Sequence, residues 1–151
     1  MKLTQLVTKD LIKLNLEGLT KEEIMEEMIE MLDRAGVLED KEKYKQSLYR
    51  REEEGSTGIG FGIAIPHGKS DAVKKTSVAF GLKRSGVDWD SLDGETAKLI
   101  FMIAVPTQNA GDEHLKILQL LSRKLMDDDF RESLLRATNV EEIMELFEQM
   151  A

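Results

Sequence analysis

Residues 58–69 read Gly-Ile-Gly-Phe-Gly-Ile-Ala-Ile-Pro-His-Gly-Lys, and the two faces of this segment differ in bulk. Large apolar residues alternate with glycine or alanine, at Ile59, Phe61, Ile63 and Ile65. Because successive side chains of a strand point to opposite faces, the pattern predicts one β-strand that is bulky on one face and bare on the other. The bulky face would pack into a core, while the bare face lets another group approach the backbone.

The end of this segment presents a histidine among small neighbours. Pro66 has no N–H to donate and is predicted to end the strand, so that His67 follows at the strand's end beside Gly68. A neutral imidazole, with an ordinary pKa of about 6.5, can act as nucleophile, base or metal ligand. The small neighbours leave room for a large incoming group, such as a phosphoryl group carried by another protein. The alternative is a strand-end histidine that only hydrogen-bonds at the surface.

Residues 63–68, Ile-Ala-Ile-Pro-His-Gly, are preceded by Ser-Thr-Gly-Ile-Gly at positions 56–60. Together they closely resemble the active-site segment of the enzyme IIA (EIIA) components of the sugar phosphotransferase system, in the fructose/mannitol group. The likeness extends over most of the chain. It implies that His67 takes a phosphoryl group from phospho-HPr and gives it to a cysteine of a IIB component. It also implies a mixed β-sheet flanked by helices, and no cofactor.

The composition excludes several classes of function. The chain has 151 residues, which fits one domain over residues 1–151, and no cysteine, which removes disulfides, thiolate zinc sites and thiol catalysis. Its net charge of -8 argues against DNA or RNA as a partner, because phosphate binding needs a basic surface. The longest apolar run, residues 99–106, is too short to cross a bilayer. We therefore expect a cytoplasmic protein that does not insert into a membrane.

Periodicity predicts the remaining elements. Alternating or continuous apolar runs indicate strands at residues 12–16, 78–82 and 98–105, and the dipeptides at 85–86 and 93–94 indicate turns. Helix caps are predicted at Thr20, at Asp40, and at Thr138 or Asn139, and a further helix is predicted to start at Asp128 or Asp129. After a polar loop at 107–111, another helix opens at Asp112, with a buried side formed by Leu115, Leu118, Leu121 and Leu125. Strands and helices mixed in this way predict a single layered α/β domain, and the resemblance adds helices on both sides of a mixed sheet.

Two further residues gain a role through the resemblance. Arg51 lies in a charged helix end that would otherwise be a solvated surface, but the family has an arginine sixteen positions before the active histidine and beside it. A guanidinium there could bind two phosphoryl oxygens at once. His114 lies at the start of a predicted helix, where backbone N–H groups attract phosphate, and the family places a histidine near the active one. The alternative for His114 is a polar residue of the first turn with no chemical role.

Two other kinds of site, a nucleotide-binding loop and a zinc site, have partial support in the sequence. Residues 62–70 end in Gly-Lys-Ser like a nucleotide-binding P-loop, but that pattern needs glycine where Ile63 stands, which argues against ATP binding and a magnesium-dependent kinase. A zinc site could be built from His67, His114 and either Asp112 or Glu113. The two histidines are 47 positions apart, with no ligand-spaced pair, which argues against a hydrolytic metalloenzyme.

The predicted function is therefore phosphoryl transfer in the uptake of fructose or a related sugar. The alternative is a regulatory nitrogen-type IIA protein, which also carries the Ser-Thr-Gly-Ile-Gly segment and whose phosphorylation state controls a protein partner. Residues 111–116, Gly-Asp-Glu-His-Leu-Lys, and residues 122–126, Ser-Arg-Lys-Leu-Met, look more like fructose-type components. The sequence thus favours transport over regulation.

Overall fold

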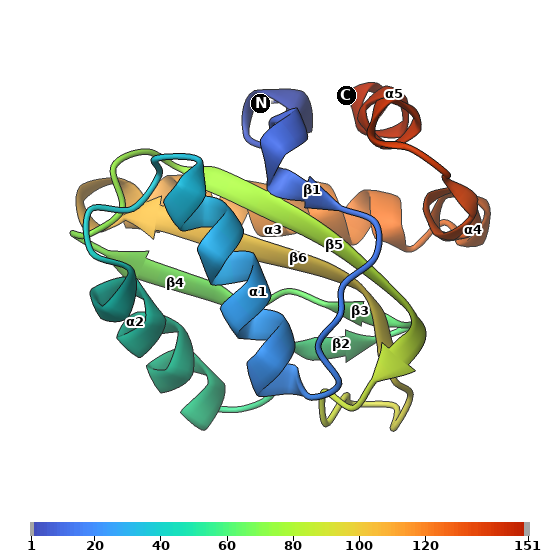
Figure 1. Ribbon diagram of the computed structural model, residues 1–151, viewed down its shortest axis with the longest axis horizontal. Helices are drawn as coiled ribbons and strands as arrows, with labels where there is room; N and C mark the ends of the chain where they lie inside the picture. Colours follow the sequence, from blue (N-terminus) through green and yellow to red (C-terminus); the bar gives the residue numbers. More distant parts are fainter. Residues whose placement is uncertain (1, 150–151) are drawn as a thin grey trace.

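The protein folds around one mixed sheet of six strands (Figure 1). The computed structural model describes residues 2–149, apart from the side chains at 109–112. The strands are β1 (Ile12–Lys13), β2 (Gly58–Gly60), β3 (Ile63–Ala64), β4 (His67–Ser70), β5 (Ser77–Val87) and β6 (Ala97–Pro106). Their order is β1-β5-β6-β3-β2, and β4 pairs with β6 further along the same edge as β3.

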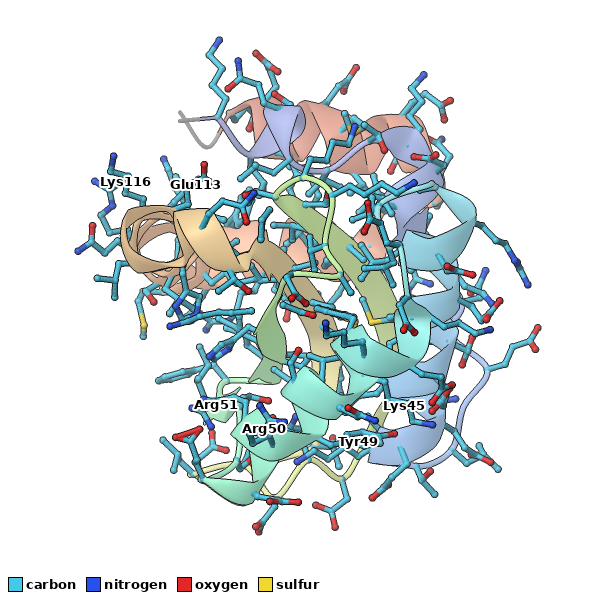
Figure 2. All side chains as sticks on the ribbon, turned by 90° about the vertical axis from the view of Figure 1, so that its left-hand side faces the viewer. Lys45, Tyr49, Arg50, Arg51, Glu113 and Lys116 are labelled. Carbon is cyan, nitrogen blue, oxygen red and sulfur yellow. The ribbon has the colours of Figure 1, made fainter. Side chains whose placement is uncertain are left out.

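Helices cover both faces of this sheet. They are η1 (Leu3–Gln5), η2 (Lys9–Leu11), α1 (Lys21–Arg34), α2 (Lys41–Glu53), η3 (Thr107–Asn109), α3 (Ala110–Leu125), α4 (Asp128–Arg136) and α5 (Val140–Glu148). In Figure 1, α1 and α2 lie in front of the sheet and α3 lies behind it, and the turned view of Figure 2 shows α1 and α3 on opposite sides. The predicted α/β class with helices on both sides is confirmed. Within residues 2–149, every helix is too short or too polar to cross a bilayer.

The central strand β6 organises the sheet. Residues 99–106 are all buried, as the unbroken apolar run predicts for a strand covered on both faces. On one side β6 pairs antiparallel with β5, and on the other it pairs parallel with β3 and then β4. The pairing of His67 with Ile103 fixes the place of the predicted active-site histidine next to the core strand.

Helix starts follow the predicted caps closely. The Thr20 hydroxyl accepts the Glu23 N–H at 3.1 Å, and Asp40 and Asn139 cap α2 and α5 through their side-chain oxygens. Helix α4 starts at Asp128, as predicted, and the side chain of Asp127 caps it. Side-chain capping of exposed N–H groups is a local interaction, so sequence alone identifies it well.

The predicted single strand over residues 58–65 is wrong. The chain instead forms a hairpin: β2 and β3 run antiparallel around a turn in which Phe61 and Gly62 have φ of +58° and +77°. Two successive positive φ values make the tight turn whose twist matches that of paired strands. Because the chain reverses, Ile59 and Phe61 are exposed while Ile63 is buried. The period-two pattern could not reveal this, since alternation persists across a two-residue turn.

Two other strand predictions are corrected. Strand β5 does not turn at 85–86 but continues to Val87, with Gly86 at φ +80° where the pairing with β6 shifts register. A glycine of positive φ suits a bulge as well as a turn. The first strand is shorter than the predicted 12–16: only Ile12 and Lys13 are strand, although the Leu16 N–H still bonds the Leu82 carbonyl at 3.0 Å.

The start of α3 also differs from the prediction. The expected loop at 107–111 is a 3-10 turn followed directly by the helix, which begins at Ala110. Leu115, predicted to be buried, is 57% exposed, whereas Ile117 and Leu121 are fully buried. Leu115 lies about 200° around the helix axis from Ile117, so it points away from the sheet.

Candidate active site

His67 opens strand β4, so its predicted place at the end of a strand is wrong. Pro66 does not end the pairing, because its carbonyl still accepts the N–H of Ile103 at 2.9 Å, and β4 continues from His67 to Ser70. Proline removes one donor and leaves its acceptor intact. The histidine is therefore held by paired backbone on both sides.

The ring of His67 is oriented by a backbone carbonyl. Its Nδ1 lies 2.9 Å from the Ile65 oxygen, which can only accept a hydrogen bond, so Nδ1 carries the proton and donates. Nε2 consequently holds the lone pair. The ring is half-buried, and burial, with further contributions from Arg51 and Lys69, lowers its pKa below the ordinary value, although the Ile65 bond and Glu52 oppose this. A neutral ring with a free Nε2 is the form in which imidazole is a nucleophile.

A second imidazole lies against the first. The ring centroids of His67 and His114 are 4.4 Å apart and the rings are tilted by 43°. Within the described part of the chain, the Nε2 of His114 is buried and has no hydrogen-bond partner. Burial, then His67, Lys69 and Arg51, lowers the pKa of His114 to about 4. His114 is thus neutral at cellular pH, and its Nε2 is a polar atom without a partner among the described residues.

Arg51, the third predicted site residue, lines the same cavity as His67 and His114. A cavity of about 370 Å³ is lined by residues from three elements, α2, β4 and α3: Ser47, Arg50, Arg51, Glu54, His67, Gly68, Lys69 and His114. In Figure 2, α2 with Arg50 and Arg51 and the start of α3, marked by Glu113, both face the viewer. One Arg51 nitrogen, Nη1, donates to the Gly55 carbonyl at 2.8 Å. The structure therefore brings all three predicted site residues to one cavity.

The close packing of α2 against β4 determines the position of this cavity. A Cβ added to Gly68 would lie 2.5 Å from the Ser47 Oγ and 3.1 Å from Tyr44, so a larger residue here would force these neighbours to shift. The buried Tyr44 hydroxyl donates to the Ile103 carbonyl at 2.8 Å, which ties α2 to β6 as well. The helix that carries Arg51 is thereby held against the strand that carries His67.

A buried polar cluster anchors the end of α2. The Glu52 carboxylate accepts the Thr57 hydroxyl at 2.7 Å and lies 2.6 Å from the Lys21 ammonium, while Trp89 donates to the same hydroxyl at 3.0 Å. The sequence alone places Glu52 in a solvated charged run, but its side chain is only 10% exposed. Its buried partners come from α1 and from the segment after α2, which no local pattern reveals. Trp89 is fully buried, as its predicted packing role requires.

Two residues of the zinc alternative, His67 and His114, lie together, whereas Glu113 is engaged elsewhere. The Glu113 carboxylate accepts the Thr76 hydroxyl, and the side chain of Asp112 lies outside the described residues. Among the side chains that are described, no three His, Cys, Asp or Glu residues gather as a metal site would require.

Comparison with known proteins identifies the family. Residues 5–150 match the family described as "Phosphoenolpyruvate-dependent sugar phosphotransferase system, EIIA 2". The chain belongs to this family. It is therefore a phosphoryl-transfer component of a sugar phosphotransferase system, and the resemblance seen in the active-site segment is confirmed.

Relatives of this EIIA chain differ in length. It is 46% identical over 149 residues to the PTS system fructose-specific EIIABC component of Bacillus subtilis, which covers 99% of the chain and 23% of that relative. It is 42% identical to the PTS system fructose-specific EIIA component of Haloferax volcanii, covering 93% of the chain and 91% of that relative. The chain thus spans about a quarter of the first relative and nine-tenths of the second.

Solved structures of the family share the fold. Nitrogen regulatory protein IIA-Ntr from Neisseria meningitidis superposes with a TM-score of 0.87 at 36% identity, covering 95% of this chain and 97% of that one. IIA mannitol from Escherichia coli, also solved in complex with phosphorylated IIB mannitol, gives a TM-score of 0.81 at 31% identity. The crystal structure of IIA mannitol covers 93% of this chain and 97% of that one.

Proposed function

We propose that the Nε2 of His67 accepts a phosphoryl group from phospho-HPr in the cytoplasm and passes it to a cysteine of a IIB component. The observation that carries this proposal is the hydrogen bond from Nδ1 to the Ile65 carbonyl, which leaves Nε2 as the unprotonated nitrogen of the ring. Residues 1–151 act as one EIIA unit in this proposal.

Each step exchanges one bond to phosphorus for another. The Nε2 lone pair forms a new N–P bond while the N–P bond of the donor phosphohistidine breaks, and the donor ring recovers the electron pair. His67 keeps the proton on Nδ1, where it is hydrogen-bonded to the Ile65 carbonyl. The phosphorylated ring therefore carries a positive charge beside the phosphoryl oxygens. A IIB thiolate then forms an S–P bond, and the electron pair returns to Nε2. Donor and product bonds are similar in energy, so positioning and charge balance suffice.

Arg51 and His114 balance the charge of the transferring group. The guanidinium of Arg51 binds two equatorial oxygens, and His114 carries its proton on Nε2 and donates it to a third. Both groups line the cavity that His67 shares, so neither needs to move far.

Fructose, or a related sugar, is the transported substrate in this proposal. Support comes from the two relatives named fructose-specific, at 46% and 42% identity. Support for a IIB partner comes from the solved complex of IIA mannitol with phosphorylated IIB mannitol, at 31% identity to this chain.

Phosphorylation in a reconstituted system tests the role of His67. The chain mixed with enzyme I, HPr and phosphoenolpyruvate should gain one phosphate that is labile in acid and stable in base. His67→Ala should gain none, while Arg51→Ala and His114→Ala should be phosphorylated more slowly at the same position. Stoichiometric label on His67→Ala would overturn the assignment.

A regulatory role is the second candidate, because the IIA-Ntr protein of Neisseria meningitidis shares 36% identity and a TM-score of 0.87. Complementation of an EIIA deletion for growth on fructose separates the two. Growth that depends on His67 supports transport. A chain that is phosphorylated at His67 but restores growth on no sugar supports regulation.

A further inference from the structure

Strand β4 presents a lysine beside the active histidine. Gly68 is buried against Ser47 and Tyr44 of α2, so the residues on either side of it, His67 and Lys69, share the opposite face of the strand. Lys69 is exposed and lines the same cavity as His67 and His114. The sequence alone predicts no role for Lys69, although its position two residues after His67 can be read from it.

Lys69 differs from its neighbour Lys43 in having no ionic partner among the described side chains. Among the described residues it makes no ion pair or side-chain hydrogen bond, whereas Lys43 on α2 is paired with Asp71 at 2.7 Å. The chain carries a net charge of -8, yet this cavity is lined by three cationic side chains, Arg50, Arg51 and Lys69, and by one carboxylate, Glu54. An unpaired cation in a locally basic cavity of an acidic protein suits an anionic group.

The geometry allows Lys69 to reach a group on His67. Residues two apart on a strand are about 6.6 Å apart along it, which a lysine side chain can span. The charge of Lys69 also contributes to the lowered pKa values of both His67 and His114, so it acts on both rings.

We propose that Lys69 is a further catalytic residue, whose ammonium binds the oxygens of the phosphoryl group carried on His67. This proposal rests on the proposed phosphorylation of His67. Lys69 supplies a mobile point charge, unlike the fixed fork of Arg51, so it can follow the phosphoryl group as a partner delivers or removes it.

The equilibrium between phospho-HPr and the phosphorylated chain tests this role. A residue that binds the phosphoryl group stabilises the phosphorylated chain, whereas a residue that only docks HPr speeds both directions equally and leaves the equilibrium unchanged. We compare Lys69→Met with Lys69→Arg, which keeps the charge. Lys9→Met is the matched control, because Lys9 is an exposed lysine of η2 outside the cavity.

Lys69→Met should shift the equilibrium about threefold to tenfold toward phospho-HPr, the effect expected from one exposed charge-assisted contact. It should also lower the transfer rate at saturating phospho-HPr. Lys69→Arg should restore most of both, and Lys9→Met should change neither. An unchanged equilibrium with a raised KM would assign Lys69 to docking and overturn the proposal, as would no change at all. Failure of the underlying function is distinct, because the unmodified chain would then take up no phosphate on His67.

Discussion

The half-buried imidazole of His114 makes the stability of this EIIA chain depend on pH. In the unfolded chain a histidine binds a proton near its ordinary pKa of about 6.5, whereas in the folded chain His114 does so only at about 4. Between these values the unfolded state binds more protons, so the free energy of unfolding falls as the pH is lowered from about 7 toward 4. Replacing His114 by leucine should remove this contribution.

The magnitude follows from the two pKa values. At about 1.36 kcal/mol per pH unit, the contribution lost at pH 5 is about 2 kcal/mol for a fully buried ring. The ring of His114 is only half-buried, so solvent screening reduces the expected loss to about 1 kcal/mol. The direction follows from the lowered pKa, because a base that binds its proton less tightly in the folded state favours unfolding in acid.

Urea unfolding at about pH 7.5 and about pH 5 measures the effect. The unmodified chain should lose about 1 kcal/mol more than His114→Leu between the two conditions. His67 is present in both proteins, so its own titration largely cancels. Leu115→Ala, a change at the exposed neighbour on α3, should leave the pH dependence of the unmodified chain intact. An equal loss in the unmodified chain and His114→Leu would refute the reasoning.

Three further predictions concern the scaffold, each read out as the urea midpoint. Tyr44→Phe leaves the buried Ile103 carbonyl without its 2.8 Å donor and should cost about 1–2 kcal/mol. Gly68→Ala places a methyl group 2.5 Å from the Ser47 Oγ and should cost about 1–3 kcal/mol, less when Ser47→Ala is added. Phe61→Asn should raise stability by about 0.5–1 kcal/mol, because asparagine tolerates the φ of +58° better than phenylalanine.

Local chemistry explains which elements could be predicted from the sequence. Caps at Thr20, Asp40 and Asn139, and the apolar run of β6, depend on neighbours within a few residues, and they are confirmed. The hairpin at Phe61 was not predicted, because an alternation of large and small residues fits one continuous strand as well as two paired strands. The burial of the Glu52 side chain was not predicted for another reason: its ionic partner, Lys21, lies on α1, far from it in the sequence.

In the candidate site, one residue could be predicted from its own segment, and two depend on contacts that are distant in the sequence. His67 could be singled out from its own segment, because small neighbours and a strand pattern surround it. Arg51 and His114 came only from the resemblance, since they reach His67 through contacts distant in the sequence: α2 seats on the bare face of Gly68, and α3 follows β6, which pairs with β4. Neither feature can be recognised in a single segment of the sequence: a glycine that lets a helix approach a strand, and a strand register that brings two elements together. What the sequence does carry is the glycine itself, because a side chain at position 68 would crowd Ser47 and Tyr44 on the helix that also carries Arg51.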